Sequence, residues 1–257
     1  NDFLACTISS RGAEKLRLVS RKNVEYLRKP DAIWDSVAPI LFPNVGRLYQ
    51  GKTCIHNQTY HLPLHGFLRD REFDLLQQKD NEITFVSVYN EQTLQQYPFK
   101  YKVLVNYTLK ELTLHTNISV INEDQRQMPF NIGGHPGFRC PLYENETFDD
   151  YRVVFEKKES FSSPVVEENG LLNFDKSRYT FHETEEIALN YDYFTNDALV
   201  IPRVKSKRVW LFNKENKGIM FSYPSFVTLA LWTRPNAGFL CLEPWIGYAD
   251  IYQKQTD

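Results

Sequence analysis

Alternating apolar and polar residues give the clearest structural signal along this chain. In "YKVLVNYTL", residues 101–109, every second residue from Tyr101 is apolar or aromatic. In "LTLHTNISV", residues 112–120, leucine, isoleucine and valine recur at alternating positions among threonine, histidine, asparagine and serine. A period of two is typical of strands with one buried face, so both segments are predicted to be half-buried antiparallel strands.

Further short apolar segments are also predicted as strands, and helical patterns are almost absent. The segment "NKENKG", residues 213–218, is rich in turn-forming residues and is predicted as the loop of a hairpin. No segment keeps a helical period over three turns, and only residues 31–38 are predicted as a short helix. The other predicted strands are 83–88, 151–155, 207–213, 218–223, 226–232 and 238–243.

Many short strands separated by turn residues indicate a β-sandwich or barrel. The chain has no Pro/Gly/Ser-rich linker, no low-complexity tract and no internal repeat, so residues 1–257 are predicted to form one domain. We therefore expect an all-β fold, a large antiparallel β-sandwich with little helix. In such a fold, polar side chains can gather on an open or concave sheet face.

Composition narrows the class of ligand. Hydrophobic residues make up 42% of the 257 residues and aromatic residues 14%, which is enough for a sizeable core. Thirty Lys and Arg stand against 32 Asp and Glu, a net charge of -2 with no long run of one sign. We therefore expect a neutral or small-molecule partner, with no nucleic acid and no membrane surface. A monomer or homodimer is also expected.

The cysteines favour a reducing compartment. Four cysteines are widely spaced without a CxxC pair, which fits neither a zinc ribbon nor a dense disulfide framework. No apolar stretch approaches about 18 residues and no signal-peptide pattern opens the chain, so a cytoplasmic location is expected. The predicted free thiols are Cys6, Cys54, Cys140 and Cys241.

One histidine lies in an unusually constrained setting. In "NIGGHPGFRCPL", two glycines precede His135, and a proline and a glycine follow it. A glycine pair permits a positive φ or a close approach of the backbone, and Pro136 favours an extended conformation at His135. Such a segment can hold an imidazole in one place. The alternative is a surface loop with an incidental histidine.

A second histidine and a glutamate have related settings. His65 in "LPLHGFLRDREF" also precedes a glycine, whereas His115 falls on the polar face of a predicted strand and is expected to be solvated. Glu243 ends an apolar strand in "FLCLEPWIGYAD". It is either a rim residue, exposed at the edge of the sheet, or a buried carboxylate whose neighbours are arranged to offset the cost of its burial. With the two histidines it could form an acid–base pair acting on a sugar, whose ring would stack on an aromatic such as Trp245.

Other types of site have no sequence support. The chain contains no HxH or HExxH spacing, so no metal site is predicted. It also lacks a G-x-S-x-G elbow, a P-loop and a dinucleotide fingerprint.

Four collinear segments carry a family resemblance. They read "YPFKYKVLVNYTL", "LTLHTNISVIN", "MPFNIGGHPGF" and "CLEPWIGYAD". In order and spacing they resemble the aldose 1-epimerase (galactose mutarotase) family, in particular its LacX-like bacterial branch. The resemblance extends from about residue 36 to residue 250. It implies a large β-sandwich with a sugar site on an open sheet face and no cofactor.

The resemblance also implies a role for particular residues. His135 matches the general acid to the sugar ring oxygen, Glu243 matches the base for the anomeric hydroxyl, and His65 matches a second active-site histidine near the ring oxygen. Arg47 of "FPNVGRL" is similar to an arginine that binds sugar hydroxyls, and Asp197 of "FTNDALVI" is similar to a sugar-binding aspartate.

The residue types suit this reaction. Mutarotation opens a hemiacetal ring, lets the C1 carbonyl rotate so that its other face meets O5, and closes the ring again. A histidine with a pKa of about 6.5 and a glutamate with one of about 4.3 can be protonated and ionised together near neutral pH, especially if burial raises the pKa of the glutamate. No covalent intermediate is needed.

Three alternatives stay open. A hexose-6-phosphate 1-epimerase is one, because Arg69 lies where such enzymes also carry an arginine and arginine suits phosphate. Against it, "DSVAP" at 35–39 stands where those relatives have an arginine before a Gly-Gly-x-Pro turn. The second alternative is a carbohydrate-binding module without turnover. The third and weakest is a polysaccharide lyase or hydrolase, which would need a tyrosine base or a second carboxylate.

Overall fold

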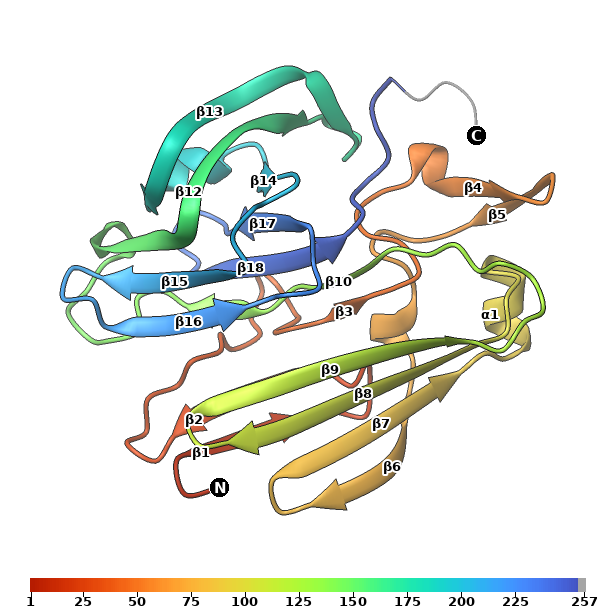
Figure 1. Ribbon diagram of the computed structural model, residues 1–257, viewed down its shortest axis with the longest axis horizontal. Helices are drawn as coiled ribbons and strands as arrows, with labels where there is room; N and C mark the ends of the chain where they lie inside the picture. The colour runs from red at the N-terminus through yellow and green to blue at the C-terminus, as the bar shows by residue number, and fades with distance from the viewer. Residues whose placement is uncertain (254–257) are drawn as a thin grey trace.

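Antiparallel sheets make up most of the molecule in the computed structural model, which describes residues 1–253 (Figure 1). About 50% of the residues lie in strands and 8% in helices. The prediction of an all-β fold with antiparallel sheets and little helix is confirmed.

A six-stranded sheet runs through the middle of the molecule. Its strands follow the order β14-β17-β18-β10-β3, and β11 pairs with β18 beside this row. Because successive side chains of a strand point to opposite faces, Leu240 and Leu242 enter one hydrophobic core while Cys241, Glu243 and Trp245 share the other face. The strands are β3 (Ile40–Leu41), β10 (Ile132–Gly134), β11 (Gly137–Arg139), β14 (Leu199–Ile201), β17 (Thr228–Trp232) and β18 (Phe239–Ile246).

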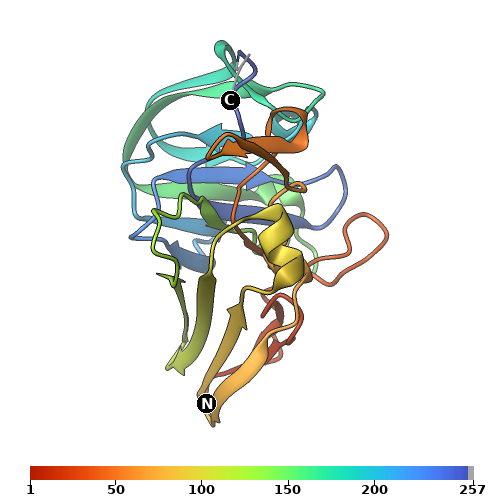
Figure 2. The same cartoon turned by 90° about the vertical axis from the view of Figure 1, so that its right-hand side faces the viewer.

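A four-stranded sheet in the order β13-β12-β15-β16 packs on the leucine face of the central sheet (Figures 1 and 2). Val153 and Leu211 pair across β12 and β15 and are fully buried against the central-sheet leucines. The core between these sheets excludes water from one side of the strand that carries Glu243. The strands are β12 (Tyr151–Val166), β13 (Leu172–Ala188), β15 (Arg208–Asn213) and β16 (Gly218–Ser222).

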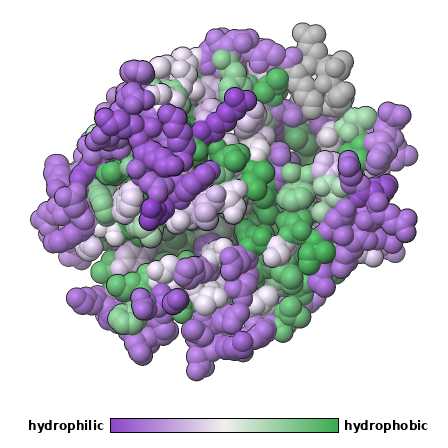
Figure 3. All heavy atoms as spheres, in the orientation of Figure 1, coloured by the Kyte–Doolittle hydropathy of each residue, from purple (hydrophilic) through white to green (hydrophobic). Residues whose placement is uncertain are grey.

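A second four-stranded sheet, β6-β7-β8-β9, encloses a separate core. Tyr101, Val103, Val105 and Tyr107 of β8 are buried there, as their period-two spacing predicts. His115 on β9 is exposed, as predicted. On the face shown in Figure 3, hydrophilic side chains cover most of the periphery and hydrophobic ones show near the middle. The strands are β6 (Asp74–Lys79), β7 (Glu82–Val88), β8 (Tyr101–Lys110) and β9 (Thr113–Asn122).

Two strand pairs and a few short helices complete the described chain. None of the helices in residues 1–253 is long and apolar enough to cross a membrane. The strand pairs are β1 (Leu4–Ile8) with β2 (Lys15–Ser20), and β4 (Lys52–Ile55) with β5 (Gln58–His61). The helices are α1 (Glu91–Gln96), η1 (Tyr49–Gly51), η2 (Leu68–Asp70), η3 (Phe148–Asp150) and η4 (Tyr191–Phe194).

Most of the predicted strands lie where the alternation places them. Residues 213–218 form the predicted hairpin loop between β15 and β16, and an added Cβ at Gly218 would lie 1.8 Å from the Leu211 carbonyl oxygen. The segment predicted at 151–155 continues as β12 to Val166. All four cysteines are free, as predicted.

The predicted helix at residues 31–38 is wrong. Arg28 and Glu14, which lie outside the segment, bind carbonyl and N–H groups that a helix would pair with each other. The Asp31 carboxylate accepts the backbone N–H of Trp34 at 3.1 Å, and the Arg28 guanidinium donates to the Trp34 carbonyl at 2.6 Å. Glu14 accepts the backbone N–H groups of Val37 and Ala38.

Candidate active site

Two neighbouring strands of the central sheet bring His135 and Glu243 together. Glu243 lies on β18, and His135 directly follows β10, the strand that pairs with the end of β18. The His135 backbone N–H donates to the Pro39 carbonyl at 3.0 Å, which fixes the chain at this point. His135 Nε2 lies 3.2 Å from Glu243 Oε2, and the two residues are 8% and 1% exposed. Glu243 is therefore not a rim residue.

The two glycines before His135 serve different purposes, and neither has a positive φ. An added Cβ at Gly133 would lie 2.6 Å from Cδ1 of Trp245, the residue opposite it on β18. At Gly134 the nearest atom would be 3.7 Å away, which is ordinary contact. Gly133 thus makes room for the Trp245 ring.

His65 reaches the same place from the loop before η2. Its φ is +66°, a left-handed conformation that is uncommon for a residue with a side chain. The Gly46 backbone N–H donates to His65 Nδ1 at 3.0 Å, and the His65 N–H donates to the Gly46 carbonyl at 3.0 Å. Since Nδ1 accepts, the ring hydrogen of neutral His65 lies on Nε2. The His65 and His135 ring centroids are 5.6 Å apart.

Two tryptophans that the sequence reasoning missed enclose His135. Its ring centroid is 4.7 Å from that of Trp34 and 5.5 Å from that of Trp232, and the two indoles are 5.5 Å apart. Trp34 lies in the segment wrongly predicted as a helix. Trp232 ends β17 opposite Cys241, so its place on the strand face of Glu243 could have been inferred only from the strand register.

Trp245, the predicted stacking platform, is only 6% exposed. Its indole N–H approaches the Glu243 carboxylate but makes no hydrogen bond of normal geometry. Its role in binding sugar stays a prediction. The buried side chains around it are Leu41, Val45, Leu172, Val200, Ala230 and Ala249.

Two arginines lie at the edge of the histidine pair. The side chain of Arg69 is 30% exposed, and its positive charge lowers the pKa of both His65 and His135. The charge of Arg47 lowers the pKa of His65. Arg47 is exposed, and its aliphatic stem passes close to the turn between β12 and β13. An added Cβ at Gly170 in that turn would lie 2.6 Å from Arg47 Cδ.

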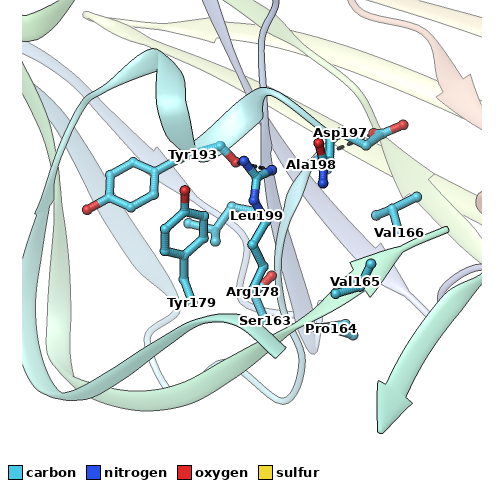
Figure 4. A pocket seen from close by; sticks show the side chains of 11 residues that line it. Ser163, Pro164, Val165, Val166, Arg178, Tyr179, Tyr193, Asp197, Ala198 and Leu199 are labelled. Carbon is cyan, nitrogen blue, oxygen red and sulfur yellow. Dashed lines mark hydrogen bonds between the residues drawn. The ribbon is translucent and has the colours of Figure 1, made fainter. Parts of the chain in front are cut away.

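Asp197 lies in the segment between η4 and β14, and its charge acts on Glu243. Its carboxylate accepts the Ala198 backbone N–H at 2.7 Å, and its φ of +144° is unusual for a residue with a side chain. Arg178 of β13 holds this segment by donating to the Asp192 carbonyl at 2.7 Å. It also donates to the Tyr193 carbonyl at 3.4 Å (Figure 4). Partial desolvation by the surrounding protein raises the pKa of the Asp197 carboxyl.

Burial makes the His135 and Glu243 pair uncharged. It holds the pKa of His135 well below 6.5, and the neighbouring His65 lowers it further. It also raises the pKa of Glu243 well above 4.5, and the negative charge of Asp197 adds to this increase. The expectation of a protonated histidine beside an ionised glutamate therefore does not hold for the pair as it stands. Desolvation penalises both charges.

His65 is also neutral. Burial, Arg69 and Arg47 together lower its pKa to about 3. With Nδ1 held by Gly46, neutral His65 can donate a hydrogen bond from Nε2 but cannot act as an acid near neutral pH.

Three donor atoms of this site could hold a metal ion. One ligand atom each from His135, Cys241 and Glu243 lies within 4.8 Å of the other two. Burial raises the pKa of the Cys241 thiol well above 9.0, so a metal would have to displace its proton. The structure thus brings a thiol, not expected from the sequence, beside the acid–base pair.

A β-sandwich with this site on the second face of its central sheet has the architecture of the galactose mutarotase-like proteins. The sequence model of the family described as aldose 1-epimerase matches residues 1–255. The LacX protein of Lactococcus lactis subsp. lactis is 34% identical over 257 residues, which cover 96% of this chain and 86% of that protein. The chain belongs to the aldose 1-epimerase family.

Solved structures agree with this assignment. A galactose mutarotase related enzyme from Lactobacillus acidophilus has a TM-score of 0.90 at 30% identity, covering 100% of this chain and 87% of the other. A galactose mutarotase-like protein from Lactobacillus casei has a TM-score of 0.89 at 28% identity, covering 99% and 91%.

Proposed function

We propose that the protein is a mutarotase that interconverts the α and β anomers of a free aldohexose such as glucose or galactose. The contact between His135 Nε2 and Glu243 Oε2 carries this proposal, because it joins an acid and a base in a buried site of the aldose 1-epimerase family. His65, Trp34 and Trp232 lie beside the His135 ring of this contact.

The pair can exchange the two protons that the reaction moves. Transfer of the Glu243 proton to His135 across 3.2 Å gives an imidazolium and a carboxylate without changing the net charge. The imidazolium then protonates the ring oxygen O5 while the carboxylate takes the proton of the O1 hydroxyl. The C1–O5 bond breaks and a C1=O1 carbonyl forms. This step returns the pair to its uncharged form.

Ring closure reverses the same steps after the carbonyl has turned. Neutral His135 takes the proton from the O5 hydroxyl as O5 attacks C1, and Glu243 returns a proton to O1. Neutral His65 orients the sugar by donating from Nε2, and Arg47 and Asp197 bind its hydroxyls from the edge of the site. Trp34 and Trp232 keep water from the imidazole and offer apolar surface to the ring.

Polarimetry on freshly dissolved α-glucose and α-galactose tests the proposal. We expect the native chain to accelerate the decay of optical rotation. Glu243→Gln and His135→Asn should each lower kcat/KM by roughly 10²- to 10⁴-fold, because general acid–base catalysis contributes about that much. His115→Asn and Glu168→Gln, both at exposed positions, serve as matched controls and should keep the native rate.

Unchanged rates in Glu243→Gln and His135→Asn would contradict this mechanism. Sugar binding without any acceleration by the native chain would instead indicate a carbohydrate-binding module.

A hexose-6-phosphate 1-epimerase is the second candidate. The proximity of Arg69 and Arg47 to the histidine pair favours it, because guanidinium groups bind phosphate through paired hydrogen bonds. Glucose 6-phosphate measured beside glucose separates the two candidates. A higher kcat/KM for the phosphorylated sugar, lost in Arg69→Gln, would favour the second candidate.

A further inference from the structure

Arg28 is a buried arginine that takes no part in the proposed proton transfers. It is 3% exposed, and its Nη2 lies 2.9 Å from Oδ1 of Asp31, whose side chain is 46% exposed. Removing a charge from water is costly, and a well-packed apolar side chain of similar volume often gives equal or greater stability than a buried ion pair. Stability alone therefore gives no reason for a cation at this position.

The Arg28 guanidinium binds the backbone of the Trp34 loop, residues 29–36. Arg28 Nη1 donates to the Trp34 carbonyl at 2.6 Å and also to the Ser36 carbonyl. The Arg28 backbone N–H donates to the Gly137 carbonyl at 2.9 Å, so Arg28 is itself fixed to β11. From residue 29 to residue 35 every residue except Trp34 is exposed. Arg28 thus ties an otherwise exposed loop to the central sheet.

The same guanidinium also contacts the Trp34 ring. Its central carbon lies over the Trp34 ring at 4.9 Å from the centroid and over the Phe239 ring at 4.6 Å. A guanidinium over an aromatic face is attracted by the electron density of the ring. The other neighbour of the Trp34 ring is the His135 imidazole, with centroids 4.7 Å apart. One side chain therefore fixes both the backbone and the ring of the tryptophan that covers the imidazole.

Gly137, two residues after His135, makes room for this arrangement. An added Cβ at Gly137 would lie 2.8 Å from Arg28 Cδ and 3.0 Å from Trp34 Cζ3. The φ of Gly137 is not positive, so the lack of space and not the backbone conformation accounts for a glycine here. The segment that carries His135 is thus shaped to fit Arg28 and Trp34, which come from a distant part of the sequence.

We propose that Arg28 is a positioning residue for mutarotation, which holds Trp34 against the His135 imidazole and so keeps water from the proton-transferring pair. This inference rests on the proposed mutarotase function. Water at the imidazole would compete with the ring oxygen O5 for its proton. Arg28 touches neither the sugar nor the reacting atoms and acts through Trp34, so its removal should matter only while Trp34 is present.

A double-mutant cycle in kcat/KM tests this role. Arg28→Met keeps an unbranched stem beside Gly137 and removes the guanidinium, and Trp34→Ala removes the ring. Each single variant should lose about tenfold in kcat/KM on glucose and galactose, and the double variant should stay within about twofold of Trp34→Ala, because residues that act through one another are not additive. Arg28→Lys, whose ammonium group can still donate to the loop carbonyls, should retain more activity than Arg28→Met.

A matched arginine controls for general effects of such a substitution. Arg152 of β12 also donates to a backbone carbonyl, that of Asn213 at 2.7 Å, but belongs to the outer sheet. Arg152→Met should keep the native kcat/KM. Hydrogen exchange of the Trp34 loop, followed by mass spectrometry, gives a readout that does not depend on activity. Exchange in residues 29–36 should be faster in Arg28→Met and unchanged in Arg152→Met.

The outcomes distinguish the two proposals. Equal losses from Arg28→Met in the native chain and in Trp34→Ala would overturn the positioning role, since Arg28 would then act without Trp34. Native rates in Arg28→Met would overturn it as well and leave the proposed function standing. If Arg28→Met does not fold, the same cycle with Arg28→Lys decides. Failure of the native chain on both sugars would refute the proposed function, and the positioning role would fall with it.

Discussion

At the scale of single residues, Glu243 keeps its proton at pH values where an ordinary carboxyl group has lost it. Above pH 4.5 the unfolded chain releases this proton and the native chain retains it. The native state then binds more protons, so this residue lowers the free energy of unfolding as pH rises. The effect is about 1.4 kcal/mol per pH unit until the native pKa is reached.

Glu243→Gln should therefore be more stable than the native chain at pH 7, although it is expected to be inactive. A glutamine has no proton to retain, and its amide can donate to His135 Nε2. In urea denaturation at pH 5, 6 and 7, the free energy of unfolding of Glu243→Gln should exceed that of the native chain by an amount that grows with pH. An advantage that is the same at all three values would show that the native carboxyl is ionised.

Substitutions at His65 can separate the roles of its two ring nitrogens. In His65→Asn the side-chain oxygen can replace Nδ1 and accept the Gly46 N–H, and asparagine tolerates the positive φ. This variant should stay within about 1 kcal/mol of native stability but lose roughly 10-fold or more in kcat/KM, since the Nε2 donor is missing. Polarimetry and thermal unfolding check both.

His65→Gln is the matched opposite variant. Its amide nitrogen can replace Nε2, but it lacks the group that binds Gly46, so stability should fall further than in His65→Asn. The reverse order of stability would contradict the role assigned to Nδ1.

At the scale of elements, β10 and β18 form the base of the site, and their spacing depends on one glycine. Gly133→Ala would place a methyl group 2.6 Å from Trp245 Cδ1 and displace that ring from beside Glu243. We expect a loss of about 1–3 kcal/mol in stability, as for other overpacked positions, together with a lower kcat. Thermal unfolding and polarimetry measure the two effects.

Gly134→Ala is the control for that variant, because its methyl group would meet its nearest neighbour at 3.7 Å and its φ is ordinary. It should keep native stability and activity. Equal losses in the two alanine variants would mean that chain flexibility before His135 matters more than room for Trp245.

The elements that the sequence predicted well are those with one buried face. β8 is the clearest case, since four residues at every second position are buried. β13 (Leu172–Ala188) was not predicted, because most of its residues are exposed and polar and its pairing with β12 holds it in place. α1 was missed because its six residues are too few for a helical period, although Asn90 and Thr93 form a capping box.

At the scale of the whole molecule, three buried titratable groups shape the dependence of stability on pH. His65 and His135 stay neutral in the native state, so the unfolded chain binds more protons than the native chain below pH 6.5. Stability therefore falls as pH decreases from 6.5. Glu243 has the opposite effect above pH 4.5. Among these three groups, the two histidines outweigh the glutamate between these values, and the glutamate outweighs the histidines above pH 6.5.

From these three groups we expect stability to stop rising near pH 6.5 and then to decline until the native pKa of Glu243 is reached. In Glu243→Gln the decline above pH 6.5 should disappear while the decline below it remains. Denaturant titrations at several pH values measure the free energy of unfolding and check the decline on each side of pH 6.5. A native chain whose stability rises steadily up to pH 8 would contradict the assignment of a retained proton on Glu243.

Sequence alone determined the all-β class and the identity of the acid and base candidates. Alternating burial is a local property of a strand, and the motifs around His135 and Glu243 are local too. Tertiary structure decided the rest. Trp34, Trp232 and Cys241 join the site through strand register and loop packing, which no local pattern encodes. The charge state was also decided there, because desolvation depends on everything packed around the pair.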